Sequence, residues 1–121
     1  MRTTMLRSAF WMCALAILVM SLMPPVPQMP TTGWDKSNHM LGFATLMLLG
    51  RWAYLGRTAV MVSGLLAYGA SIELLQSLTP FRFAEWGDLL ADAIGIFAGW
   101  AVGQAMSWVL GNWNASESKH E

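Results

Sequence analysis

The stretch WDKSNHMLGF, residues 34–43, puts an acid, a base and an imidazole at the start of an apolar run. Asp35 and His39 are four residues apart and would share one face of a helix. A carboxylate beside an imidazole can exchange a proton near neutral pH. Asp35 and Lys36 are also typical of a helix start, where they cap the helix or anchor it at a membrane interface. Both interpretations stay open, with His39 as a hydrogen-bonding residue in each.

Further polar side chains surround the last loop between apolar runs. Glu73 and Gln76 are three residues apart in ASIELLQSLTP, so they share a helical face. Asp88 and Asp92 are one turn apart in GDLLADAIG, and Arg82 lies in the loop between the two pairs. An ionisable side chain in hydrocarbon costs roughly 3 kcal/mol even on the lenient insertion scale. Glu73 and Asp92 are therefore expected to face other helices, in a functional site or in a structural bridge.

A stripe of small residues follows Asp92. Gly95, Gly99 and Gly103 recur every fourth residue, which leaves a smooth groove along one side of a helix. This spacing allows a second helix backbone to approach closely. Asp92 lies almost in line with the stripe and is expected to point at the same neighbouring helix.

The composition indicates a membrane protein of one domain. Hydrophobic residues make up 55% of the 121 residues and charged residues 12%, about half the charged share of a typical soluble domain. The net charge is zero, so the lipid bilayer is the expected partner and nucleic acid is not. The single cysteine, Cys13, excludes an intramolecular disulfide and is interpreted as a packing residue. No cofactor is expected, and the acids and histidine match no metal-binding spacing.

Four apolar runs approach the roughly 20 residues that a bilayer crossing requires. The first is interpreted as a retained helix, because no small-residue cleavage site precedes the prolines after it. The sequence therefore predicts an all-α, polytopic membrane protein with four transmembrane helices. The runs cover residues 8–23, 34–55, 59–78 and 88–110. The expected divisions are a first helix with a proline-rich outer loop, a core and a cytoplasmic polar tail, at residues 1–33, 34–110 and 111–121.

The distribution of Lys and Arg predicts the orientation of these helices. Basic residues concentrate on the cytoplasmic side of multi-pass proteins. Five basic residues fall on the side that holds the N-terminus, namely Arg2, Arg7, Arg51, Arg57 and Lys119. Lys36 and Arg82 fall on the other side, so both termini are predicted to be cytoplasmic. The polar residues would then collect at the outer face. Acids outnumber bases there, and this excess of negative charge would raise carboxyl pKa values, favour protonation of His39 or attract a cation.

The ordered set of these residues resembles the VanZ-like family of small integral membrane proteins. The resemblance rests on DKSNH with Phe43, ELLQ, PFR and DLLADAIG followed by Gly99, over about residues 34–103. It implies a helical domain of the bacterial inner membrane with polar motifs near the outer face. The namesake is associated with low-level resistance to teicoplanin, a lipid-tailed glycopeptide antibiotic. Members often carry Asn where Asp92 stands, so this chain holds an additional ionisable group.

Three functions are compatible with this pattern. The leading hypothesis is a cell-envelope protein whose outer polar site binds a lipid-linked cell-wall precursor or another amphiphile, with Lys36 and Arg82 available for phosphate. The second makes the cluster an acid/base or metal-assisted enzyme on a lipid-linked substrate. The third is proton or ion movement, which four short helices would support only as an oligomer. The residues assigned to the site are Asp35, Lys36, His39, Glu73, Gln76, Arg82, Asp88 and Asp92.

Overall fold

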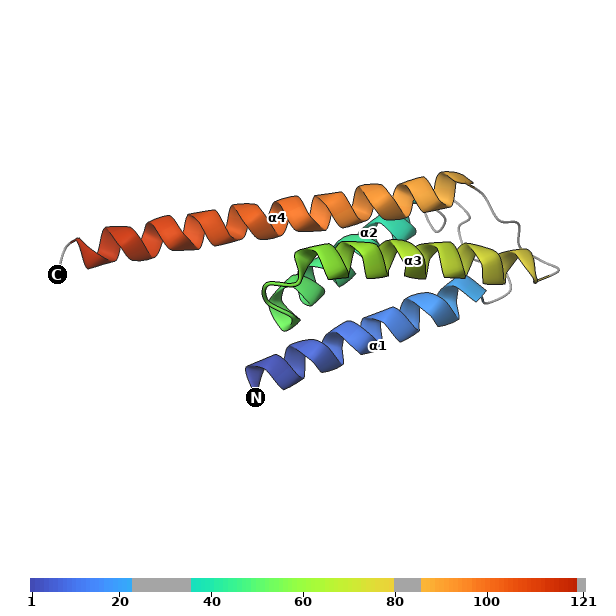
Figure 1. Cartoon of the computed structure of the whole chain (residues 1–121), viewed down its shortest axis with the longest axis horizontal. Coiled ribbons are helices and arrows are strands. Elements are labelled where there is room, and N and C mark those ends of the chain that lie inside the picture. Colours follow the sequence, from blue (N-terminus) through green and yellow to red (C-terminus); the bar gives the residue numbers. More distant parts are fainter. Residues whose placement is uncertain (23–35, 80–85, 120–121) are drawn as a thin grey trace.

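The computed structural model describes residues 1–22, 36–79 and 86–119, and over these residues the chain is all-helical, as predicted. Four helices follow one another in an up-and-down order (Figure 1). They are α1 (Arg2–Leu22), α2 (Lys36–Ala53), α3 (Thr58–Ser77) and α4 (Trp86–Ser118). Each falls on one of the four predicted apolar runs, although α1 begins earlier and α4 ends later than expected.

The order of the helices brings their polar ends together. The last residue of α1, the first of α2, the last of α3 and the first of α4 lie at the same end of the bundle, which we call the site end (Figure 1). The start of α1 and the α2–α3 turn lie at the opposite end. We call it the arginine end, because it carries Arg2, Arg7, Arg51 and Arg57. Segments far apart in the sequence thus supply neighbouring side chains at each end.

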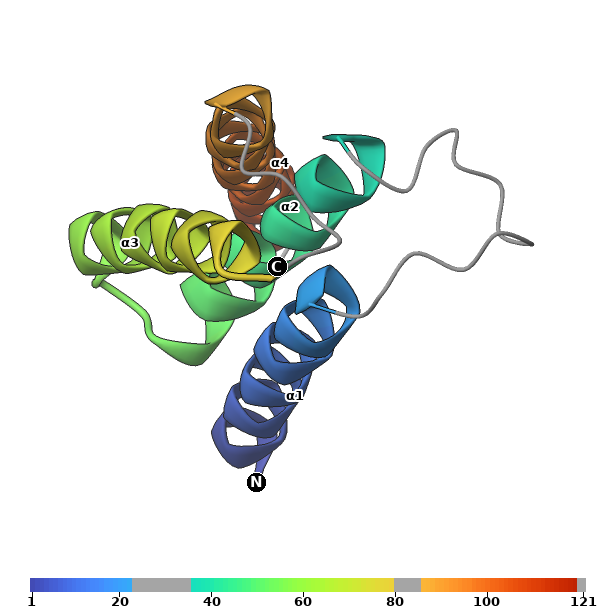
Figure 2. The same cartoon turned by 90° about the vertical axis from the view of Figure 1, so that its right-hand side faces the viewer.

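Three of the helices, α1, α3 and α4, are long and apolar enough to cross a membrane. Helix α2 has 18 residues, but its first turn, KSNH, and Arg51 near its end make it more polar than the other three. It nevertheless contacts all three other helices, and in the view along the bundle it lies among them (Figure 2). The side chains of Phe43, Leu46 and Met47 on α2 are fully buried, so α2 is the central helix of the bundle.

The outer surface of the bundle is strongly apolar. Large hydrophobic side chains such as Val60 and Leu74 on α3 and Phe97 on α4 are two-thirds exposed. In water this exposure would be unfavourable, and contiguous apolar surface of this kind marks a membrane or protein contact. A lipid environment accounts for helices that are apolar on both their inner and outer faces.

Helix α4 continues past the predicted end of its apolar run. Residues 111–118 belong to the segment that was expected to form a polar tail, and in the structure they continue α4. The segment contains no proline, and a single glycine such as Gly111 costs a helix only about 1 kcal/mol. Trp113 Nε1 also donates a hydrogen bond to Glu117 one turn later, at 2.9 Å. The 33 residues of α4 extend about 50 Å, well beyond a hydrocarbon core of about 30 Å.

Candidate functional site

A hydrogen-bonded pair of His39 and Asp92 occupies the middle of the site end. His39 Nδ1 lies 2.9 Å from Asp92 Oδ1 and joins α2 to α4. His39 is 7% exposed and Asp92 is not exposed at all. Two groups that ionise in water are therefore held together away from solvent. The pair becomes an ion pair when the imidazole is protonated.

Helix α3 accommodates the Asp92 carboxyl group at Gly69. A Cβ atom at Gly69 would lie 2.7 Å from Asp92 Oδ2, closer than non-bonded carbon and oxygen atoms approach. The absence of a side chain at this position therefore lets Asp92 lie between α2 and α3. Gly69 was not among the predicted site residues, because a single glycine in an apolar run has no distinguishing sequence signal.

Two further carboxyl groups flank the pair. Glu73 follows Gly69 by one turn on α3, and Asp88 precedes Asp92 by one turn on α4. Each is 9% exposed. The carboxyl groups of Asp92, Asp88 and Glu73 all interact electrostatically with the His39 ring. The structure thus brings three predicted acidic residues, from α3 and α4, around the imidazole of a fourth predicted residue, His39 on α2.

Gln76 connects the same region to α1. Its Nε2 donates a 2.9 Å hydrogen bond to the carbonyl oxygen of Ser21. Gln76 is 2% exposed and Ser21 is 4% exposed. The last carbonyls of a helix lack partners within the helix, so a donor from a neighbouring element satisfies one of them here. The sequence indicates that such carbonyls need donors, but it does not indicate which donor reaches which helix end.

Two buried oxygen atoms of the cluster accept no hydrogen bond from the part of the chain that the structure describes. They are Gln76 Oε1 and Asp92 Oδ2. A buried polar atom without a partner costs about 1–3 kcal/mol. Both atoms are acceptors, so the groups that suit them are hydrogen-bond donors, such as hydroxyl, amine and ammonium groups.

Three of the predicted site residues are not placed. Asp35 and Arg82 lie outside the described residues. Lys36 is the first residue of α2, but its side chain also lies outside them. Within residues 1–22, 36–79 and 86–119, no group of three or more His, Cys, Asp or Glu side chains has the arrangement of a metal site.

The glycine stripe of α4 sets the register between α2 and α4. A Cβ atom at Gly95 would lie 2.3 Å from the Met40 carbonyl oxygen, and one at Gly99 would lie 2.4 Å from that of Ala44. The backbones of α2 and α4 are therefore in contact over this length, the close approach that this glycine spacing allows. Gly103 continues the stripe and packs against the Arg51 side chain. Because Met40 lies opposite Gly95, His39, the residue before Met40, is brought beside Asp92, which precedes Gly95 by almost one turn.

These features define a class: a small helical protein with three membrane-length helices and a buried cluster of carboxyl, imidazole and amide groups at one end. The VanZ/LLP1 family model matches residues 29–107, and the chain belongs to this family. The family assignment made from the spaced motifs is thereby confirmed. The match includes α2, α3 and the predicted site residues, whereas α1 precedes it. Comparisons with curated proteins and with solved structures gave no match.

Proposed function

We propose that this chain is a multi-pass protein of the bacterial cytoplasmic membrane, with four membrane crossings and both termini in the cytoplasm. Three membrane-length helices and the family assignment support the membrane location. The positions of Arg2, Arg7, Arg51 and Arg57 at one end of the bundle support the orientation, because arginines favour the cytoplasmic side. The site end then meets the outer headgroup layer of the bilayer.

The proposed activity is binding of the polar headgroup of a lipid-linked cell-wall precursor or a similar amphiphile at the site end. The observation that carries this proposal is the buried cluster itself, in which Gln76 Oε1 and Asp92 Oδ2 accept no hydrogen bond from the described residues. Hydroxyl or amino groups of a sugar or peptide headgroup would supply these donors. The lipid part of such a ligand would remain in the bilayer beside the apolar outer surface of the helices.

The phosphate of such a ligand would require a basic partner. Lys36 starts α2 at the site end, and Arg82 precedes α4 in the sequence by four residues. Both are candidates for contacts with the phosphate, because charge-assisted hydrogen bonds to phosphate are among the strongest in proteins.

A binding titration in lipid nanodiscs tests the proposal. We expect purified protein to bind a fluorescent lipid-linked disaccharide–peptide precursor, and Asp92→Asn to weaken binding by roughly tenfold, because the amide replaces one acceptor oxygen with a donor NH2 group. Glu117→Gln, at an exposed residue of the C-terminal part of α4, is the matched control and should bind like the wild type. Equal binding by the wild type and Asp92→Asn would contradict the proposed role of the cluster.

Acid/base catalysis on the same ligand is the second candidate, and the His39–Asp92 pair favours it. A carboxylate hydrogen-bonded to one ring nitrogen orients an imidazole as a general base. Under this alternative His39→Gln would retain precursor binding and abolish conversion of the precursor, which chromatography of the reaction products would detect. If the wild type binds the precursor without converting it, catalysis is excluded and binding remains as the proposed function.

Proton or ion movement through one chain is less compatible with the packing. Next to the site, the buried side chains of α2 are Phe43, Leu46 and Met47. Over the described part of α2, the next ionisable group after His39 is Arg51, three turns away. This segment of α2 without ionisable groups favours ligand binding at the site end over proton or ion transfer across the bundle.

A further inference from the structure

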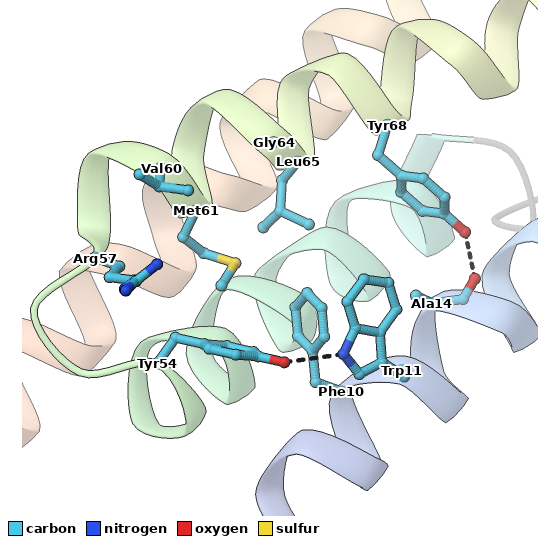
Figure 3. A pocket seen from close by; sticks show the side chains of 10 residues that line it. All are labelled: Phe10, Trp11, Ala14, Tyr54, Arg57, Val60, Met61, Gly64, Leu65 and Tyr68. Carbon is cyan, nitrogen blue, oxygen red and sulfur yellow. Dashed lines mark hydrogen bonds between the residues drawn. The ribbon is translucent and has the colours of Figure 1, made fainter.

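An apolar cavity lies between α1, α3 and the α2–α3 turn, towards the arginine end and away from the polar site (Figure 3). Its volume is about 380 Å³, which is within the range of roughly 300–1,000 Å³ typical of ligand pockets. The lining comes mainly from aromatic and aliphatic side chains. They are Phe10, Trp11, Tyr54, Met61, Leu65 and Tyr68.

Two hydrogen bonds hold the walls of the cavity in place. Tyr68 on α3 donates to the carbonyl oxygen of Ala14 on α1 at one end of the cavity (Figure 3). Trp11 Nε1 donates to the Tyr54 hydroxyl oxygen at 3.0 Å, which connects α1 to the end of α2. Helix α1 is therefore joined to α3 at one end of the cavity and to Tyr54, just after the end of α2, at the other.

The cavity carries positive charge at its arginine end. Arg57 is the charged member of the described lining, and it is exposed. The Arg7 guanidinium lies 4.6 Å from the centre of the Tyr54 ring, and its Nε donates to the Ala53 carbonyl oxygen at 3.2 Å. Over the described parts of α1, α2 and α3, the acidic residue is Glu73, at the site end. The apolar cavity thus ends at Arg57, and Arg7 lies against the Tyr54 ring of the same lining, with no acid at this end of α1, α2 and α3.

We propose that this cavity holds one acyl chain of an anionic phospholipid, with its phosphate group on Arg57. An acyl chain matches the apolar, aromatic lining, and the phosphate matches the exposed guanidinium of Arg57. The cytoplasmic leaflet is the membrane surface that attracts basic side chains, and the arginine end is the end assigned to it. This site shares the membrane location with the function proposed above, and it is independent of what the polar site binds.

Gly64 provides a way to fill the cavity without disturbing the backbone. Gly64 lines the cavity, and a Cβ atom there would meet nothing within 4 Å. Gly64→Leu is therefore expected to place its side chain in the acyl-chain site without a backbone clash. Gly111 is also open at its Cβ position, but it lies on the exposed part of α4. Gly111→Leu is thus a matched control with the same change at a helical glycine.

Native mass spectrometry of delipidated protein tests the proposal with two added lipids, phosphatidylglycerol and phosphatidylcholine of identical chains. We expect the wild type to retain one phosphatidylglycerol molecule roughly tenfold more tightly than phosphatidylcholine, because both lipids carry the phosphate but the choline cation of phosphatidylcholine would be repelled by the positive charge of Arg57. Gly64→Leu should lose both lipids, and Arg57→Gln should lose the preference for phosphatidylglycerol. Arg57→Lys should retain most of this preference, and both Gly111→Leu and Arg2→Gln should behave like the wild type.

Three results would overturn the proposal. They are equal retention of the two lipids by the wild type, unchanged retention by Gly64→Leu, and an equal loss of retention in Gly64→Leu and Gly111→Leu. Circular dichroism of each variant shows whether its helices form. Because Arg57 is exposed, Arg57→Gln provides the charge test even if Gly64→Leu does not fold.

Discussion

The residues that distinguish this chain from a simple apolar bundle are His39 and Asp92. Asp92 has no exposed surface, and its one described hydrogen bond is the 2.9 Å contact with His39. A buried carboxyl group that loses its partner retains the cost of desolvation without the compensating contact. The two residues should therefore behave as one energetic unit.

Mutation of this pair should be non-additive. We expect His39→Ala to lower the free energy of unfolding by about 1–3 kcal/mol. The double variant His39→Ala/Asp92→Asn should be more stable than the sum of the two single changes predicts, by roughly 1 kcal/mol. Reversible unfolding in mixed micelles measures both quantities. Additive effects would mean that the two side chains do not interact in the folded protein.

At the scale of single elements, α2 and α4 are joined by contact between their backbones. Cβ atoms at Gly95 and Gly99 would lie 2.3 and 2.4 Å from carbonyl oxygens of α2, which cannot move without shifting the helix. The Cβ position of Gly103 instead meets Cδ of Arg51, 2.6 Å away, and this long side chain can move. The glycine stripe therefore cannot accept a side chain near the site, whereas it can accept a small one near the arginine end.

Alanine substitutions along α4 should reproduce this gradient. Gly95→Ala and Gly99→Ala should each destabilise the protein by about 1–3 kcal/mol, because added atoms in a packed contact force a backbone shift. Gly103→Ala should cost less. Gly111→Ala should be neutral or stabilising by up to about 1 kcal/mol, because alanine favours the helix and the position is open. Equal effects at all four positions, measured by thermal unfolding, would contradict the proposed packing.

At the site end, helix α1 is held by the hydrogen bond from Gln76 to Ser21. Cys13 lies on α1, is partly buried and packs against the core. We expect Gln76→Ala to loosen α1 and to increase the rate at which a maleimide modifies Cys13, the single thiol of the chain. Ser77→Ala, at the exposed neighbouring position, should leave the rate unchanged. A Gln76→Ala rate equal to that of the wild type would show that this bond does not hold α1 in place.

At the scale of the whole molecule, the buried acids and the arginines of the bundle lie at opposite ends. The buried acids Glu73, Asp88 and Asp92 lie at the site end, and the arginines of α1, α2 and the α2–α3 turn lie at the other. This separation gives the molecule two chemically distinct ends, and the proposed ligand and the proposed phospholipid belong to opposite ones.

Much of this arrangement could be predicted from the sequence. Apolar length predicted the four helices, and the fourfold glycine spacing predicted a close contact along α4 in line with Asp92. Periodicity could not predict that Ser21 and Gly69 complete the site, because these positions depend on which helices become neighbours. The polarity of GNWNASES suggested a tail, whereas nothing in that segment ends a helix.

The most direct test of the central claim, that the polar cluster lies at the outer face, is side-specific thiol labelling in intact cells. In a Cys13→Ser background, Leu55→Cys and Leu78→Cys place thiols just before and just after α3, where the leucines are 78% and 76% exposed. We predict that a membrane-impermeant maleimide labels Leu78→Cys, beside the site, in intact cells and labels Leu55→Cys only after permeabilisation. The reverse pattern, or labelling of both from outside, would contradict the account.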